Sequence, residues 1–469
     1  MLKTMTIAAM ILSVLLPAAS SQTPGLEGMW EGTLSVGGAS LRLIFKVAKA
    51  PDGSLTATLD SLDQGALGLP VDKVTLDGKS VLFDLKRLGA AFEAKANAEF
   101  TELTGNWKQG GLELPLVMKR TEKETKLNRP QEPQKPYPYN EEEVSYENKK
   151  AGIKLAGTLT TPRDKGPFPA VLLITGSGPQ DRNEAIFGHK PFMVLADHLT
   201  RQGIAVLRVD DRGVGGSTGN VGAATTEDFT EDVLAGVEYL KSRKEIDPKR
   251  IGLIGHSEGG IIAPLAATKS PDIAFIVLMA GTGLPGEEIL YLQGALIAKV
   301  SGASDEAIAE NRRVQERIFA ILKSEKDPKE AEKKFYALRD QLVAEMTEEQ
   351  RKAGADKPLE AQLKSVNTPW FRFFVTYDPK PALSKVKCPV LAINGERDLQ
   401  VPPRENLAAI ESALKAGGNK GFSAIMLPEL NHLFQKAATG SPGEYARIEE
   451  TISPTALKSI SDWIGRHTR

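Results

Sequence analysis

The pattern Gly-x-Ser-x-Gly, in which a serine stands between two glycines, occurs twice in this sequence of 469 residues. One copy is Gly215–Gly219 with Ser217 at its centre, and the other is Gly255–Gly259 with Ser257 at its centre. A nucleophilic serine in this pattern sits on a sharp turn between a strand and a helix, where only glycine leaves enough room for the backbone. The residues around each copy therefore decide which serine is the candidate nucleophile.

The two copies differ in their surroundings. The copy around Ser257 follows the apolar run Ile251–Ile254 directly and precedes the small and apolar residues Gly260–Ala267. This order predicts a strand, a turn and a helix, with the hydroxyl at the helix N-terminus, where backbone N–H groups can stabilise an oxyanion. The copy around Ser217 is followed by further loop residues, Asn220–Gly222. Ser257 is therefore the predicted nucleophile.

A serine hydroxyl needs a general base, and the sequence offers few. It contains five histidines, and in the chain order serine, acid, histidine only His432 and His467 follow Ser257. His467 lies on a predicted exposed helix end, whereas His432 follows the apolar run Phe422–Leu427. Because that loop leaves the carboxyl end of a predicted strand, His432 is the predicted base.

The carboxylate that orients the base should also follow a strand. Asp398 lies beyond the turn after the apolar run Pro389–Ile393, and it can reach back to support the charge on His432. Glu396 in the same loop is the alternative acid, or it caps the turn.

An oxyanion hole requires two backbone donors aimed at one point. The amide of Glu258, the residue after the nucleophile, is one predicted donor. The other is expected from the glycine-rich loop after the run Ala170–Ile174, at Ser177 or Gly178.

The elements that must position these residues are continuous apolar strands alternating with amphipathic helices. This alternation predicts an α/β doubly wound, mostly parallel sheet covered on both faces, with ligands at the carboxyl ends of its strands. The predicted strands are Val144–Asn148, Ile153–Thr160, Ala170–Ile174, Ile204–Val209, Arg250–Ile254, Ile273–Met279, Pro389–Ile393 and Phe422–Leu427, and the predicted helices include Phe192–Gln202 and Thr226–Arg243.

One segment interrupts the alternation. Between about residues 284 and 382 the pattern is helical without a strand run, which predicts a helical cap inserted over the active end of the sheet. Its last part carries Trp370, Phe371 and Phe374. These aromatic side chains either line an apolar acyl pocket or pack the cap onto the sheet.

The chain before the sheet divides into three parts. Residues 1–21 have a basic start, an apolar run and small residues, which predicts a cleaved secretory signal and an exported, periplasmic or secreted protein. Residues 22–121 contain many short alternating runs, which predict a small all-β barrel or sandwich, and its early Trp30 gives it a lipocalin-like start. Residues 122–140 are charged and then rich in proline, which predicts a spacer before the catalytic domain at 141–469.

Composition excludes several classes of function. Lys+Arg (59) and Asp+Glu (60) nearly cancel, so the sequence predicts no nucleic-acid partner. The histidines lack zinc-type spacing, which predicts no metal and no cofactor, and no later run is long enough to predict an integral membrane segment in the mature chain. Cys388 is the single cysteine and cannot form a disulfide within the chain.

Taken together, five segments resemble the α/β-hydrolase superfamily, and most closely secreted bacterial carboxylesterases and serine aminopeptidase-like hydrolases with an N-terminal β domain. The segments are Gly176–Arg182, Asp210–Ser217, Gly255–Gly260, Asn394–Pro402 and Asn431–His432. The resemblance covers about residues 140–469 and implies that Asp211 and Arg212 hold loops in place.

These observations lead to three hypotheses of function. The first is a carboxylesterase that cleaves small-molecule esters with short to medium acyl chains through an acyl-enzyme on Ser257. The second is a serine peptidase that releases N-terminal residues and binds the substrate amine through Glu258 or Glu287. The third is a hydrolase-like binding protein without catalysis.

Overall fold

The computed structural model describes residues 25–468 except 37–38, 124, 126, 349–350, 352–362 and 364. The predicted signal segment at 1–21 lies outside the described residues. The described chain forms two compact units, one of residues 25–60 and 68–123 and the other of residues 61–67 and 125–468. None of the described helices is long and apolar enough to cross a membrane.

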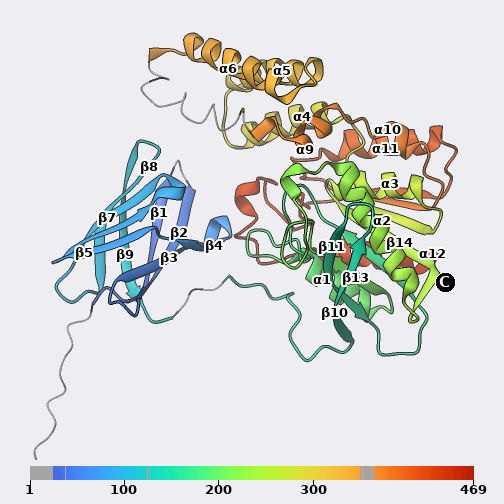
Figure 1. Cartoon of the computed structure of the whole chain (residues 1–469), viewed down its shortest axis with the longest axis horizontal. Coiled ribbons are helices and arrows are strands. Elements are labelled where there is room, and N and C mark those ends of the chain that lie inside the picture. The colour runs from blue at the N-terminus through green and yellow to red at the C-terminus, as the bar shows by residue number, and fades with distance from the viewer. Residues whose placement is uncertain are drawn as a thin grey trace, which may run out of the picture. The chain divides into compact units, whose positions relative to one another are not determined.

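The first unit is a curled sheet of nine strands in the order β4-β3-β2-β1-β9-β8-β7-β6-β5, which confirms the predicted all-β domain (Figure 1). Strands β5 and β6 form a hairpin, in which they pair antiparallel with Asp77 opposite Ser80. Gly78 in its turn has φ +58°, which glycine adopts without strain. The strands are β1 (Gly28–Val36), β2 (Ala39–Lys49), β3 (Leu55–Ser61), β4 (Ala66–Pro70), β5 (Lys73–Asp77), β6 (Ser80–Leu85), β7 (Ala90–Ala96), β8 (Glu102–Gln109) and β9 (Leu112–Thr121).

The early tryptophan is part of the core of this unit. Trp30 is fully buried, and its indole N–H donates to the carbonyl oxygen of Leu26 at 2.8 Å. The guanidinium of Arg120 lies over the indole ring, 4.5 Å from its centroid, at a distance that allows a cation–π attraction. Stacked Phe45 and Phe83, with ring centroids 4.1 Å apart, fill the interior.

The second unit contains a mixed sheet of eight strands in the order β10-β11-β13-β12-β14-β15-β16-β17. The β10–β11 and β11–β13 pairs are antiparallel, and every later pair is parallel. This is the predicted doubly wound, mostly parallel sheet. Its strands are β10 (Asn140–Asn148), β11 (Ile153–Thr161), β12 (Phe168–Ile174), β13 (Ala205–Val209), β14 (Ile246–His256), β15 (Ile273–Met279), β16 (Val390–Gly395) and β17 (Phe422–Leu427).

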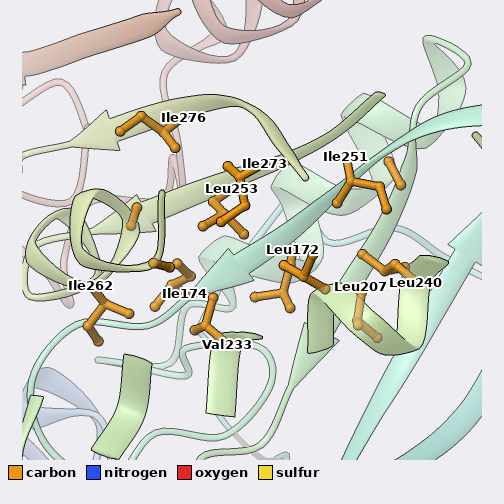
Figure 2. Close-up of a cluster of buried hydrophobic side chains, with 14 of the residues drawn as sticks. Leu172, Ile174, Leu207, Val233, Leu240, Ile251, Leu253, Ile262, Ile273 and Ile276 are labelled. Carbon is orange, nitrogen blue, oxygen red and sulfur yellow. The ribbon is translucent and has the colours of Figure 1, made fainter. Parts of the chain in front are cut away.

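Helices cover both faces of this sheet because successive strand residues point to opposite sides. In β12, Leu172 and Ile174 belong to the core cluster with the helices α2 (Thr226–Ser242), α3 (Gly259–Lys269) and α11 (Pro403–Ala416). Val171 and Leu173 instead belong to the cluster with α1 (Pro191–Arg201) and α12 (Pro454–His467). Figure 2 shows part of the first cluster, with Leu172 and Leu253 from the strands and Val233 and Leu240 from α2.

Truncation of a buried side chain in the central strand β14 is expected to reduce stability strongly. Leu253 of β14 is fully buried, so Leu253→Ala is expected to lower the free energy of unfolding of the second unit by about 2–5 kcal/mol. Urea unfolding followed by fluorescence measures this change. Ile425→Ala in β17 is the control, because Ile425 is 38% exposed and its truncation removes little buried surface. Equal losses in the two variants would contradict this account of the core.

A helical insertion separates β15 from β16, as predicted. It contains α4 (Gly286–Val300), α5 (Asp305–Ser324), α6 (Pro328–Glu345), α9 (Pro369–Thr376) and α10 (Lys380–Leu383). Tyr291, Phe319 and Phe335 form a small core between α4, α5 and α6. Ile289 of α4 and Phe374 of α9 pack against Ile261 of α3, so the cap is attached to the helix that follows the candidate nucleophile.

The proline-rich stretch packs against the second unit. Arg129 donates to the carbonyl oxygens of Phe187, Gly188, Ala446 and Ile448 at 2.7–3.2 Å. Because a guanidinium presents five N–H groups in one plane, this single side chain ties several loops together. The part of the predicted spacer around Arg129 is therefore attached to the second unit.

Candidate active site

Ser257 lies at the turn between β14 and α3, at the carboxyl edge of the sheet. Its φ is +53°, a left-handed conformation that a residue other than glycine adopts only under constraint from its surroundings. The backbone N–H of Ser257 donates to the carbonyl oxygen of Met279 in β15 at 2.8 Å, and this bond fixes the turn.

The glycines around Ser257 are required by close backbone contacts. A Cβ atom at Gly255 would lie 2.0 Å from the carbonyl oxygen of Gly259, and one at Gly259 would lie 2.3 Å from that of Ile174. At Gly260 it would lie 2.5 Å from the Cα of Gly281. A side chain at any of these three positions would collide with the backbone, so the sharp turn around Ser257 requires glycine there.

Asp398 and His432 come together as the sequence predicts. The loops after β16 and β17 bring them to the same edge of the sheet, where Asp398 Oδ2 lies 2.8 Å from His432 Nδ1. The backbone N–H groups of Gln400 and Val401 donate to Asp398 Oδ1 at 2.8 and 2.9 Å. Both side chains are buried, so the imidazole is held in one orientation by a carboxylate that is itself held by two amides.

The predicted oxyanion donors lie beside this turn. Gly178 has φ +96°, and a Cβ placed on Gly176 would lie 3.3 Å from the Cβ of Ser257, so the loop passes close to the nucleophile. Within the described residues, the backbone N–H groups of Ser177, Gly178 and Glu258 have no protein acceptor. Free amide N–H groups at this place can donate hydrogen bonds to a substrate oxygen.

The rejected and alternative candidates have other partners. Ser217 is buried; its hydroxyl donates to the carbonyl oxygen of Asp210 at 2.7 Å and accepts from the N–H of Ala156 at 2.9 Å. Glu396 accepts from the N–H of Glu429 at 3.1 Å, and His467 stacks on Trp463. Among the contacts of the described residues, none joins the side chain of Ser217, Glu396 or His467 to His432.

The three aromatic residues of the cap divide into two groups. Phe371 packs with Phe319 in the core of the cap. Trp370 and Phe374 stack with ring centroids 5.3 Å apart and face Ile261 of α3. Both groups pack the cap together or onto the sheet, and only Trp370 among them reaches a residue of the turn.

That residue is Glu258, whose side chain is 3% exposed. Glu258 Oε1 accepts from the indole N–H of Trp370 and from the hydroxyl of Thr226, each at 2.7 Å. Burial raises the pKa of the Glu258 carboxyl, and these two hydrogen bonds oppose the rise. Glu258 therefore links the turn to the cap and to α2.

A second buried carboxyl lies close to the oxyanion loop. Asp211 accepts from the hydroxyl of Thr175 at 2.8 Å and from the N–H of Gln180 at 2.9 Å. This agrees with the loop-holding role that the resemblance implies. Together with Glu258 and Gly178, Asp211 lines a cavity of about 50 Å³, which admits only a small group.

Asp211 predicts an unusual dependence of stability on pH. Burial raises the pKa of its carboxyl from 3.8 to about 7, so between these values the folded protein binds a proton that the unfolded chain has released. The contribution of Asp211 is then greatest below pH 4 and is lost as the pH rises towards 7. Asp211→Asn is expected to reduce this loss by about 1–3 kcal/mol. Urea unfolding at pH 5 and pH 8 measures it, and an unchanged pH dependence in the variant would contradict it.

Two side chains that the sequence did not single out also contact the site. Glu184 Oε1 lies 2.9 Å from His256 Nδ1 and accepts from the N–H of Gly176 at 2.7 Å. His256 Nε2 lies 3.0 Å from the carbonyl oxygen of His432. The sequence could have pointed to His256 only through its position within the nucleophile pattern. No sequence pattern points to Glu184.

The fold and the arrangement at the strand ends define an α/β hydrolase. The family described as X-Pro dipeptidyl-peptidase (S15 family) matches residues 151–433, which is more than half of the chain and includes Ser257, Asp398 and His432. The protein therefore belongs to this family. The expected resemblance to α/β hydrolases is confirmed, and the chain is a hydrolase of this fold.

Individual relatives have related descriptions. Esterase EstD of Thermotoga maritima is 26% identical over 327 residues, which cover 68% of each chain. The thiohydrolase apmlB of Arthrinium phaeospermum is 30% identical over 139 residues, which cover 29% of this chain and 41% of that protein. Among solved structures, the esterase Pf2001 of Pyrococcus furiosus has a TM-score of 0.41 at 18% identity, covering 71% of this chain and 94% of that one.

Proposed function

We propose that the protein is a serine hydrolase that cleaves carboxylic esters of small molecules through an acyl-enzyme on Ser257. The observation that carries this proposal is the left-handed turn at Ser257, on the same sheet edge as the hydrogen-bonded pair Asp398 and His432. A strained serine between a strand and a helix, with a histidine and a held carboxylate nearby, is the arrangement that acyl transfer requires.

In the proposed mechanism the Ser257 hydroxyl attacks the ester carbonyl carbon and His432 Nε2 takes its proton. Asp398 remains ionised and stabilises the imidazolium through the Nδ1–H bond. The amides of Glu258 and of Ser177 or Gly178 donate to the oxyanion of the tetrahedral intermediate. His432 then protonates the leaving alcohol, and a water molecule releases the acid by the same steps.

One observation supports ester substrates, and a second supports short to medium acyl chains. EstD of Thermotoga maritima, which is similar to this chain over 327 residues, is an esterase by name. The cavity beside Gly176 and Gly178 is small, and apolar side chains such as Phe229 and Ile262 form much of its wall. A small apolar recess next to the oxyanion donors suits a short acyl group.

Hydrolysis of a p-nitrophenyl ester series tests the substrate class. We expect the highest kcat/KM for acetate to hexanoate and a decline for longer chains. A fluorophosphonate probe is expected to label the folded protein at Ser257, as mapped by peptide mass spectrometry. Absence of labelling in folded protein would instead support the third hypothesis, a binding protein without catalysis.

The second candidate function is a serine peptidase, which the description of the matched family favours. The two acidic residues predicted to bind the substrate amine are both occupied: Glu258 by Trp370 and Thr226, and Glu287 by an ion pair with Lys323 at 2.6 Å. Glycyl-prolyl p-nitroanilide and alanine p-nitroanilide, assayed beside p-nitrophenyl butyrate, separate the two functions. Activity confined to the anilides would replace the ester proposal.

We also propose that the protein is exported. The basic start, apolar run and small residues of 1–21 support this, and N-terminal sequencing of protein recovered from the periplasm or medium tests it. A mature chain beginning near residue 22 is expected. Recovery of an uncleaved chain from the cytoplasm alone would contradict the proposal.

A further inference from the structure

A second acid–histidine pair lies behind the proposed active site. Glu184 and His256 are 3% and 6% exposed, and the reaction as described above uses neither of them. Glu184 Oε1 lies 2.9 Å from His256 Nδ1, and the His256 ring lies 4.9 Å from the His432 ring, centroid to centroid. The two histidines are therefore in contact, and each has its own carboxylate.

The partners of His256 determine where its protons are. A carbonyl oxygen only accepts, so His256 Nε2 must carry the hydrogen that bonds the His432 oxygen at 3.0 Å. The other nitrogen, Nδ1, faces Glu184 Oε1, which also accepts from the N–H of Gly176 at 2.7 Å. A carboxylate oxygen that accepts from a backbone amide is stabilised in its ionised form. This arrangement favours an imidazolium at His256 and a carboxylate at Glu184.

The charges around His256 are consistent with this assignment. The groups that face it are Glu184 from the loop after β12, His432 from the loop after β17 and Asp398 from the loop after β16. Asp211 interacts electrostatically with Glu184. Burial lowers the pKa of His256, but the charge and hydrogen bond of Glu184, together with the His432 carbonyl and the charge of Asp398, outweigh burial and leave the pKa raised.

The same hydrogen bonds join three loops of the site. Gly176 begins the oxyanion loop, His256 directly precedes Ser257, and the His432 carbonyl belongs to the loop of the base. A shift of any one of these loops changes the distance between Ser257, its base and its oxyanion donors. A misplacement of about 1 Å is enough to lower a rate about 100-fold.

We propose that Glu184 and His256 form a charged positioning pair, with His256 as an imidazolium, that holds the oxyanion loop and the loop of His432 in register with Ser257. The effect of this pair on catalysis rests on the proposed function. The pair also has an electrostatic role: when His432 takes the proton of Ser257, the carboxylate of Glu184 offsets the charge already present on His256. The two neighbouring histidines can then both be cationic.

Histidine-ring NMR of the whole protein tests the charge state without reference to any substrate. With ¹⁵N-labelled histidine, His256 is expected to show two ring N–H groups at neutral pH, assigned by their loss in His256→Gln. A single ring N–H on His256, the neutral form, would overturn the charged pair.

Amide hydrogen exchange tests the positioning role independently of activity. The neutral side chain in Glu184→Gln no longer stabilises the cationic form of His256. A neutral imidazole has only one ring N–H, so His256 loses one of the two hydrogen bonds that its ring donates. The amide of Gly176 and those of the following loop are expected to exchange about tenfold faster or more, since the charge-assisted bond is weakened. Glu132→Gln, which removes a carboxylate paired with Lys190 elsewhere, is the matched control. Unchanged exchange in Glu184→Gln would overturn the positioning role.

Kinetics then measure the consequence for catalysis. Glu184→Gln and His256→Gln are each expected to lower kcat about 10- to 100-fold with little change in KM, and the double variant is expected to lose no more than the worse single one. His198→Gln, at a half-buried histidine bonded to Ser461, is the control. Wild-type kcat in both variants would overturn the proposal. Should Ser257→Ala retain full activity, the proposed function fails, whereas the NMR and exchange results still decide whether the pair exists.

Discussion

Ser257→Ala is expected to lower kcat for p-nitrophenyl butyrate by about 10⁴- to 10⁶-fold, because it removes the atom that forms the acyl-enzyme. The residual rate would come from the oxyanion donors and substrate binding alone. KM is expected to change little, since the hydroxyl adds almost nothing to ground-state binding. Steady-state kinetics, together with loss of fluorophosphonate labelling, measure both effects.

Ser217→Ala is the matched control, because Ser217 stands at the centre of the other Gly-x-Ser-x-Gly copy. Its hydroxyl bonds two backbone groups, so the substitution leaves the N–H of Ala156 without its acceptor. We expect a loss of about 1–3 kcal/mol in the free energy of unfolding and most of the wild-type kcat per folded molecule. The opposite pattern, with activity retained in Ser257→Ala and lost in Ser217→Ala, would exchange the roles of the two serines.

Asp398→Asn is expected to lower kcat by about 10⁴-fold with little effect on the fold. The reason lies in the partners of Asp398: the N–H groups of Gln400 and Val401 both bond Oδ1, so the asparagine oxygen must stay on that side. Its NH₂ group then faces His432 Nδ1, which must become an acceptor. The proton of the neutral imidazole moves to Nε2, where it blocks removal of the proton from Ser257.

Glu396→Gln tests the alternative acid of the same loop. Glu396 accepts from the backbone N–H of Glu429, and a glutamine oxygen can accept the same bond. We therefore expect kcat close to wild type. Kinetics of the two variants at several pH values decide between them, and a large loss in Glu396→Gln with none in Asp398→Asn would make Glu396 the acid.

Much of the fold follows from local patterns in the sequence. The apolar runs at Ile273–Met279 and Phe422–Leu427 are strands with those same bounds, and the helical run from Thr226 ends one residue before the predicted end. Such runs are predictable because a buried parallel strand needs apolar side chains on both faces. The attachment of the proline-rich stretch does not follow from local patterns, because it depends on hydrogen bonds from Arg129 to carbonyl oxygens of residues far away in the sequence.

The sequence by itself determined the fold class, the helical insertion and the candidates Ser257, Asp398 and His432, because each follows a recognisable strand and chain order limits the choice. Only the tertiary structure decided which side chains meet across the chain. Glu184 and His256 are 72 residues apart, Glu258 and Trp370 are 112 apart, and the His256–His432 bond spans 176. Contacts of this kind depend on how loops from different strands converge at one sheet edge. The spacing of residues along the chain does not predict which of these side chains will meet.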